Sequence, residues 1–135
     1  MTQPPSARRR LLAAAGAAVF ALALPAHAAG DDEALPLEAA RDALARRSAI
    51  VFDIREPDEH ARGAAPGMRL LPMSQIGQRL AEIPRDQPVI LVCNTQNRSK
   101  ATARALRERG WTNVHYAAGG MSEWARRGWP MVAPH

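Results

Sequence analysis

The chain has 135 residues, of which 47% are hydrophobic, 4% aromatic and 23% charged, with a formal net charge of +5. This length predicts one domain with a single core, and the scarcity of aromatic residues predicts that the core is aliphatic. Arg8, Arg9 and Arg10 lie in a segment that we expect to be removed. Without them the chain has 15 Lys and Arg against 13 Asp and Glu, a formal net charge of +2. A balance this small excludes the basic footprint of a nucleic-acid-binding domain.

Residues 1–28 have the pattern of a cleavable export signal peptide. A basic start precedes the apolar run Leu11 to Leu24, and Ala26-His27-Ala28 fits a small-x-small cleavage site. The run is too short for a comfortable transmembrane helix, so we expect no membrane anchor after cleavage. The pattern fits both ordinary secretion and a twin-arginine route, and both predict a periplasmic protein.

Residues 29–34 read as a flexible polar leader, and residues 35–135 as a single domain in which short apolar runs alternate with helical patterns. The expected strands are 35–37, 50–54, 69–71, 89–92 and 114–116. The expected helices are 38–46, a short one opening at 56–58, 74–82 with Ser74 as its N-cap, 100–110, and one after 119–120. This order predicts an α/β fold, a small open, mostly parallel five-stranded sheet with helices on both faces.

The strand expected at 89–92 is followed by Cys93, the only cysteine in the chain. Four consecutive apolar residues predict a strand buried on both faces, and Cys93 falls at its carboxyl end, where open α/β sheets bind ligands. The loop then enters a helix, whose N-terminal N–H groups and dipole favour an anion. Because Arg98 and Lys100 add positive charge, this setting predicts a reactive thiolate, with an inert buried cysteine as the competing interpretation.

Three stretches resemble signatures of the rhodanese-like sulfurtransferases. Cys93, with Arg98 five positions later and Ser99 next to it, resembles the active-site loop of that family. Residues 51–60 resemble its first signature and residues 119–124 its C-terminal one, in the family's order and spacing. The match runs from about residue 35 to residue 132 and indicates an exported bacterial member of the family.

The resemblance implies the following site. Cys93 is the catalytic residue, the substrate-binding residues are Asn94, Thr95, Gln96, Asn97, Arg98 and Ser99, and the supporting residues are Asp53, Arg55 and Lys100. The implied reaction takes sulfane sulfur from an anionic donor such as thiosulfate, holds it as a persulfide on Cys93, and passes it to cyanide or to a thiol, including a protein thiol. We expect no cofactor and no metal, because the sequence has no CxxC motif and no histidine cluster. We also expect a monomer with no nucleic-acid partner.

Two other functions use a similar loop. Cysteine phosphatases and arsenate reductases place five residues between cysteine and arginine, enough to wrap a tetrahedral oxyanion, whereas only residues 94–97 intervene here, which suits a sulfur atom. A non-catalytic or sulfide-carrying binding module is the other alternative, because Gln96 stands where the family usually has glycine. A glutamine in a left-handed conformation costs about 1 kcal/mol or more, whereas Asn97 tolerates such angles better and is the alternative position for the turn, so we expect an active enzyme that a strained Gln96 would slow.

Overall fold

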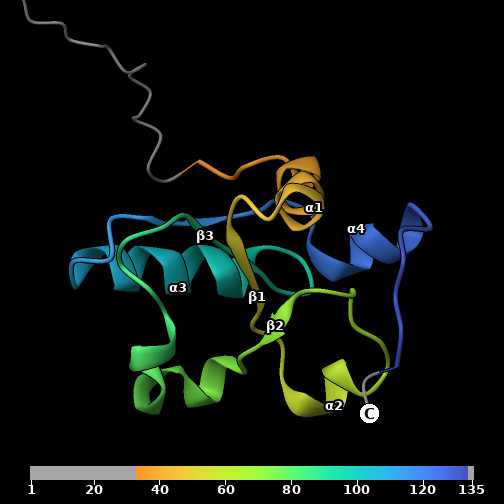
Figure 1. Cartoon of the computed structure of the whole chain (residues 1–135). Helices are drawn as coiled ribbons and strands as arrows, with labels where there is room; N and C mark the ends of the chain where they lie inside the picture. Colours follow the sequence, from red (N-terminus) through yellow and green to blue (C-terminus); the bar gives the residue numbers. More distant parts are fainter. Residues whose placement is uncertain (1–32, 134–135) are drawn as a thin grey trace, which may run out of the picture.

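The computed structural model describes residues 33–133, so the expected signal peptide and most of the leader lie outside the described residues. Within them, four parallel strands form one sheet in the order β2-β1-β3-β4. Figure 1 labels three of them, β1, β2 and β3. The strands are β1 (Ile50–Asp53), β2 (Arg69–Leu70), β3 (Val89–Val92) and β4 (Val114–Tyr116). At the outer edge of β4, where a fifth strand was expected, Leu35 makes a single parallel bridge to Ala117.

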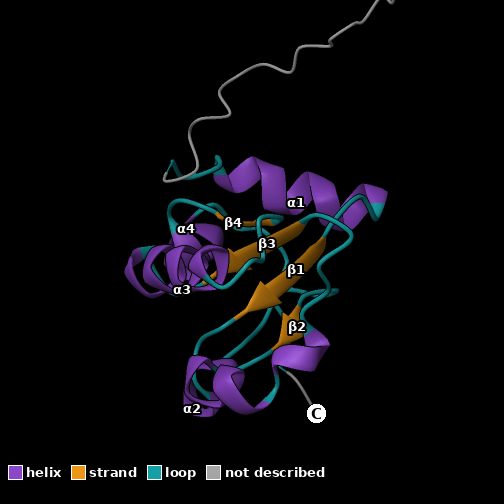
Figure 2. Ribbon diagram, turned by 90° about the vertical axis from the view of Figure 1, so that its left-hand side faces the viewer, coloured by secondary structure: helices purple, strands orange, loops and turns teal. Residues whose placement is uncertain are grey.

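Helices cover both faces of the sheet, as predicted (Figure 2). One face packs against α1 (Leu37–Arg46) and α4 (Gly120–Arg126). The other packs against α3 (Asn97–Glu108) and the 3-10 helix η2 (Met73–Gln78), with η3 (Leu80–Glu82) alongside. The short helix α2 (Pro57–His60) follows the carboxyl end of β1. The α/β fold class is therefore confirmed.

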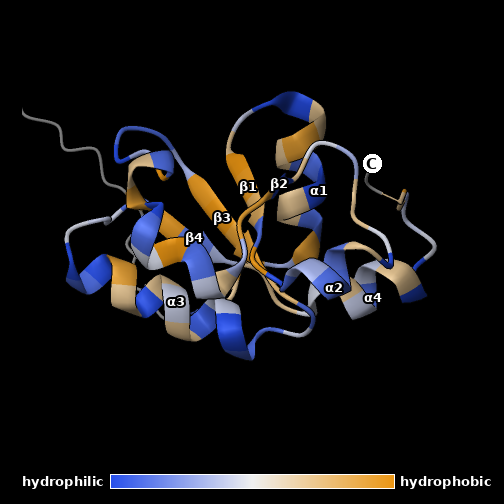
Figure 3. Ribbon diagram, turned by 90° about the horizontal axis from the view of Figure 1, so that it is seen from below, coloured by the Kyte–Doolittle hydropathy of each residue, from blue (hydrophilic) through white to orange (hydrophobic). Residues whose placement is uncertain are grey.

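The core is built on the strict alternation of side chains along the two central strands. In β3 all four residues are buried, with Val89 and Leu91 packed on the α3 side and Ile90 and Val92 on the side of α1 and α4. Burial on both faces explains why the strand is continuously apolar, and it stands out as such in Figure 3. None of the helices in residues 33–133 has the length and apolar content needed to cross a bilayer.

The tryptophans of the described residues are packing residues. Trp111 is buried in the α3 layer and its indole N–H donates to the Ile83 carbonyl at 2.9 Å. Trp124 is buried in the opposite layer, donates to the Pro130 carbonyl at 2.9 Å and stacks edge-on against Trp129. Both buried indoles thus satisfy their single donor.

The helix expected at 74–82 is the clearest error of the sequence analysis. The segment forms two 3-10 helices instead, and η2 begins after Pro72, so that Ser74 lies inside it and is not an N-cap. Only Ile76 of η2 is buried, and Gly77 interrupts any apolar stripe, so little packing favours a full α-helix. The Ser74 hydroxyl donates to Glu56 at 2.6 Å and ties η2 to the start of α2.

Candidate active site

Cys93 follows β3 directly and is 1% exposed. Its Sγ accepts a hydrogen bond from the Ser99 backbone N–H at 3.3 Å and lies 3.4 Å from Ser99 Oγ, to which the thiol donates. Ser99 is the third residue of α3, so the sulfur satisfies one of the N–H groups that the first turn of a helix leaves without a partner. An anionic sulfur at this place lies against the positive end of the α3 dipole.

The loop after Cys93 is shorter than the sequence suggested, because α3 begins at Asn97 and not at Lys100. Arg98 and Ser99 therefore belong to the first helical turn, and the loop proper is 94–96. The Lys100 backbone N–H donates to the Gln96 carbonyl at 2.9 Å, which closes that turn. In the described part of the chain, the backbone N–H groups of 94–98 donate to no protein acceptor, which leaves them available to an anion bound beside the sulfur.

The expected left-handed conformation of Gln96 is wrong. Its φ is −162°, which is extended backbone that any residue adopts, and Arg47 is the only residue other than glycine with positive φ among residues 33–133. The strain argument for a slow enzyme therefore does not apply at this position. The Gln96 side chain instead accepts a hydrogen bond from the Gly119 N–H at 3.3 Å and so joins the loop to the start of α4.

The N-terminus of α4 holds the Cys93 loop from its other side. The Met121 N–H donates to the Cys93 carbonyl at 2.7 Å, and the Ser122 N–H donates to the Asn94 carbonyl at 2.9 Å. Gly120 lies between them with φ +52°, and a Cβ at this position would lie 2.4 Å from the Cys93 and Asn94 carbonyl oxygens. Only glycine fits this contact, which gives the Gly119-Gly120 pair of the C-terminal signature its physical role.

Arg98 is paired with Glu59, a residue that the sequence analysis did not assign to the site. Its Nη1 and Nη2 donate to the two carboxylate oxygens at 2.7 and 2.8 Å, and Glu59 Oε1 also accepts the Glu56 N–H at 2.9 Å. The hydrogen bonds from Arg98 lower the pKa of Glu59 to about 2, and the same contact raises the pKa of Arg98. The only signal in the sequence was an acid in the first turn of α2.

Asp53 and Arg55 form a buried ion pair under the site, 0% and 5% exposed, with Arg55 Nη2 2.7 Å from Asp53 Oδ2. The same Nη2 donates to the Gly63 carbonyl at 2.8 Å, and His60 Nε2 lies 3.1 Å from the Asp53 carbonyl oxygen. The pair thus fastens the carboxyl end of β1 to α2 and to the loop at Gly63. It makes no hydrogen bond to the Cys93 loop.

The remaining assigned residues lie around the loop without further contacts to the sulfur. Thr95, Asn97 and Lys100 are exposed, and Asn94 is partly buried. Residues 33–133 contain no group of three His, Cys, Asp or Glu side chains arranged to hold a metal ion. The site is therefore a buried thiol in a helix-capping loop, with one guanidinium already paired beside it.

Comparison with known proteins identifies the family. Residues 37–127 match the rhodanese-like domain model, and the chain belongs to that family. A sulfurtransferase of Allochromatium vinosum is 40% identical over 85 residues, which cover 63% of this chain and 79% of the relative. The uncharacterized protein YqhL of Bacillus subtilis is 41% identical over 78 residues, and the match spans 62% of its length, slightly under two thirds.

Solved structures show the same fold. A rhodanese-related protein from Thermoplasma volcanium superposes with a TM-score of 0.64 at 23% identity, over 75% of this chain and 98% of that one. A thiosulfate sulfurtransferase from Pseudomonas aeruginosa gives a TM-score of 0.65 at 25% identity, over 76% of this chain and 20% of that larger chain. The family predicted from the three signatures is therefore confirmed.

Replacing Gly120 by alanine should destabilise the protein by at least about 2 kcal/mol, because the new Cβ meets loop backbone and must also adopt positive φ. The matched control is Gly128→Ala, where φ is +72° but no atom lies within 4 Å of the new Cβ, so only a strain of about 1 kcal/mol is expected. Urea unfolding of both variants measures the difference. Equal losses would contradict the close contact between α4 and the Cys93 loop.

The Glu59–Arg98 pair should stabilise the protein in a pH-dependent way. The folded pKa of Glu59 is about 2 against an ordinary value of 4.5, so its contribution is complete above pH 4.5 and is lost as the pH falls toward 2. Because the pair is partly exposed, we expect Glu59→Gln to lose about 1 to 2 kcal/mol at pH 7. Denaturant unfolding between pH 7 and pH 2 should show that the difference in unfolding free energy between wild type and Glu59→Gln disappears in acid. A difference that does not depend on pH would argue against the pair.

Proposed function

We propose that this protein is a periplasmic sulfurtransferase in which Cys93 carries sulfane sulfur as a persulfide. The observation that carries the proposal is the position of Sγ, which caps the N-terminus of α3 through the Ser99 N–H at 3.3 Å. At this position a hydrogen bond from the backbone and the positive end of the helix dipole stabilise the negative charge of a thiolate or persulfide sulfur. The export pattern of residues 1–28 supports a periplasmic location.

The reaction has two steps. In the first, the Cys93 thiolate attacks the outer sulfur of thiosulfate, a new S–S bond forms, and sulfite leaves with the electron pair of the broken S–S bond. In the second, cyanide or a thiolate attacks the outer sulfur of the persulfide, and thiocyanate or an acceptor persulfide leaves as the Cys93 thiolate is regenerated. Loop N–H groups that have no protein acceptor favour the anionic sulfur in both states.

The length of the loop favours sulfur over phosphate as the transferred group. Four residues separate Cys93 from Arg98, one fewer than cysteine phosphatases use to wrap an oxyanion. The sulfurtransferase of Allochromatium vinosum supports the same choice.

Arg98 is the donor-binding residue in this proposal. Its Nε makes no hydrogen bond among the described residues, so this edge can bind the sulfonate of thiosulfate while Nη1 and Nη2 stay on Glu59. Glu59 then has two effects, since it orients the guanidinium and also cancels part of its charge. Arg55 is excluded as the donor-binding group because it is buried against Asp53.

Thiocyanate formation from thiosulfate and cyanide tests the reaction. Wild-type protein should produce thiocyanate, should gain a mass of about 32 Da on Cys93 when treated with thiosulfate alone, and should be inert toward a phosphate ester. Cys93→Ser should show neither product nor adduct. A wild type no faster than Cys93→Ser and without the adduct would favour the binding-module interpretation, whereas an adduct without turnover would indicate a sulfide carrier.

Donor binding is tested by a pair of variants. Arg98→Ala should raise KM for thiosulfate about tenfold or more, because it removes a charge-assisted hydrogen bond, while Cys93 still reacts with iodoacetamide. Glu59→Gln should lower KM although it destabilises the fold, because the Arg98 charge is no longer cancelled. A merely structural role for Glu59 would leave KM unchanged or raise it. An unchanged KM in Arg98→Ala would assign donor binding to Lys100.

A further inference from the structure

We propose a second ligand site, for a small amphiphilic organic anion, in the pocket at the amino end of β1. The pocket has a volume of about 310 Å³, which is the size of a small-molecule site, and lies where Ile50 begins the strand. Cys93 follows the carboxyl end of β3, the parallel neighbour of β1, so the two sites lie at opposite ends of the sheet. Nothing in the sulfur-transfer proposal uses this pocket.

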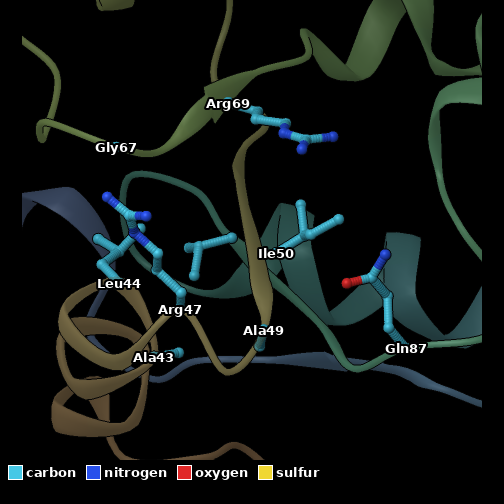
Figure 4. A pocket seen from close by; sticks show the side chains of 9 residues that line it. Ala43, Leu44, Arg47, Ala49, Ile50, Gly67, Arg69 and Gln87 are labelled. Carbon is cyan, nitrogen blue, oxygen red and sulfur yellow. The ribbon is translucent and has the colours of Figure 1, made fainter.

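The pocket combines an apolar floor with cationic walls. Its floor comes from the end of α1 and the start of β1, and consists of Ala43, Leu44, Ala49, Ile50 and Val51. Arg47 reaches it from the turn after α1, Arg69 from β2, and Gln87 from the loop before β3 (Figure 4). Two guanidinium groups and a side-chain amide beside aliphatic carbon match a carboxylate or sulfonate on a short apolar body.

Neither arginine is used elsewhere in the described structure. No carboxylate of residues 33–133 lies within ion-pair distance of Arg47 or Arg69, although other arginines of this part of the chain do pair with acids, among them Arg79 with Glu82 and Arg127 with Glu123. Arg69 acts on Glu82 only through its longer-range charge. Two like charges left unpaired around one hollow favour an anionic ligand.

The backbone at Arg47 gives independent support. Arg47 closes α1 with φ +55° and ψ +41°, a left-handed position that helices usually fill with glycine or asparagine. An arginine there is strained, and its only described hydrogen bond is from its backbone N–H to the Ala43 carbonyl, which glycine would make equally well. No hydrogen bond or ion pair to residues 33–133 explains an arginine at this position, whereas an anionic ligand in the pocket would.

The edge of β1 adds a further donor. β2 is so short that it pairs only with Phe52 and Asp53, which leaves the first half of β1 without a neighbour on that side. The Ile50 N–H donates to the Pro88 carbonyl on the β3 side, so the Val51 N–H points toward the opposite side, and no loop or turn carbonyl of residues 33–133 accepts it. Val51 lines the pocket, so this N–H also favours an anion there.

Hexanoate is a suitable probe, with hexan-1-ol as its uncharged match and sulfate as an anion without an apolar body. In amide NMR titrations of the protein, hexanoate should give saturable shifts at 43–51, Gly67 and Gln87, and hexan-1-ol should bind at least about tenfold more weakly, as the loss of a charge-assisted hydrogen bond implies. Sulfate should also bind more weakly. Equal binding of hexan-1-ol, or shifts centred on 93–99, would overturn the proposal.

Matched variants separate the pocket from general surface charge. Arg47→Gly and Arg69→Ala should each weaken hexanoate binding at least about tenfold, and Arg47→Gly should melt no lower than wild type because its left-handed strain is relieved. Arg46→Ala removes an equal charge from the exposed neighbour of Arg47 outside the pocket and should leave binding unchanged. Cys93→Ser should bind hexanoate like wild type. Weaker binding in Arg46→Ala or Cys93→Ser, or normal binding in Arg47→Gly, would overturn the site.

Discussion

The contact between two stretches of backbone, at Cys93-Asn94 and at Gly120, is the constraint on which the site depends. The carbonyls of Cys93 and Asn94 accept the first N–H groups of α4, while the Cys93 sulfur accepts an N–H from the first turn of α3. One residue is thus held by two helix N-termini at once, through its carbonyl on one side and its sulfur on the other. The approach is so close that position 120 has no room for a side chain.

This arrangement reconciles burial with reactivity at the thiol. A sulfur that is 1% exposed would ordinarily be inert in an apolar core, and Cys93 does pack with the residues beneath α3. What distinguishes it is the polar side of its environment, which supplies the Ser99 N–H and the end of a helix dipole. Burial then limits access to small molecules, which fits the proposed transfer of a single sulfur atom.

The charges around the site are organised in two layers. The deeper pair, Asp53 with Arg55, is fully buried and joins the end of β1 to α2 and to Gly63. The outer pair, Glu59 with Arg98, joins α2 to the first turn of α3 across 39 positions of sequence. The deeper pair orders the backbone, whereas the outer pair leaves one edge of the Arg98 guanidinium near the Cys93 sulfur. Arg47 and Arg69, which line the pocket at the amino end of β1, belong to neither pair and contact no carboxylate of residues 33–133.

The sequence by itself determined the parts that depend on short-range patterns. Four consecutive apolar residues gave a doubly buried β3, and the cysteine after them came at the ligand-binding end of a parallel sheet. Gly119-Gly120 marked a sharp entry into a helix, and the three signatures in order identified the family. The strand, the turn and each single signature depend on neighbouring residues only, because strand burial and turn chemistry are local properties. The family follows from the order of the three signatures along the chain.

The tertiary structure alone decided what depends on contacts between distant segments. Glu59 faces Arg98 because α2 and α3 meet at one edge of the sheet, which no spacing in the sequence shows. Gln96 avoids the left-handed region because its side chain is anchored to Gly119 and the helix starts early, at Asn97. The segment 73–82 forms 3-10 turns because too few of its side chains find a core to pack against. Packing energies of this kind outweigh helix propensities of a few tenths of a kcal/mol per residue, and they exist only once the chain has folded.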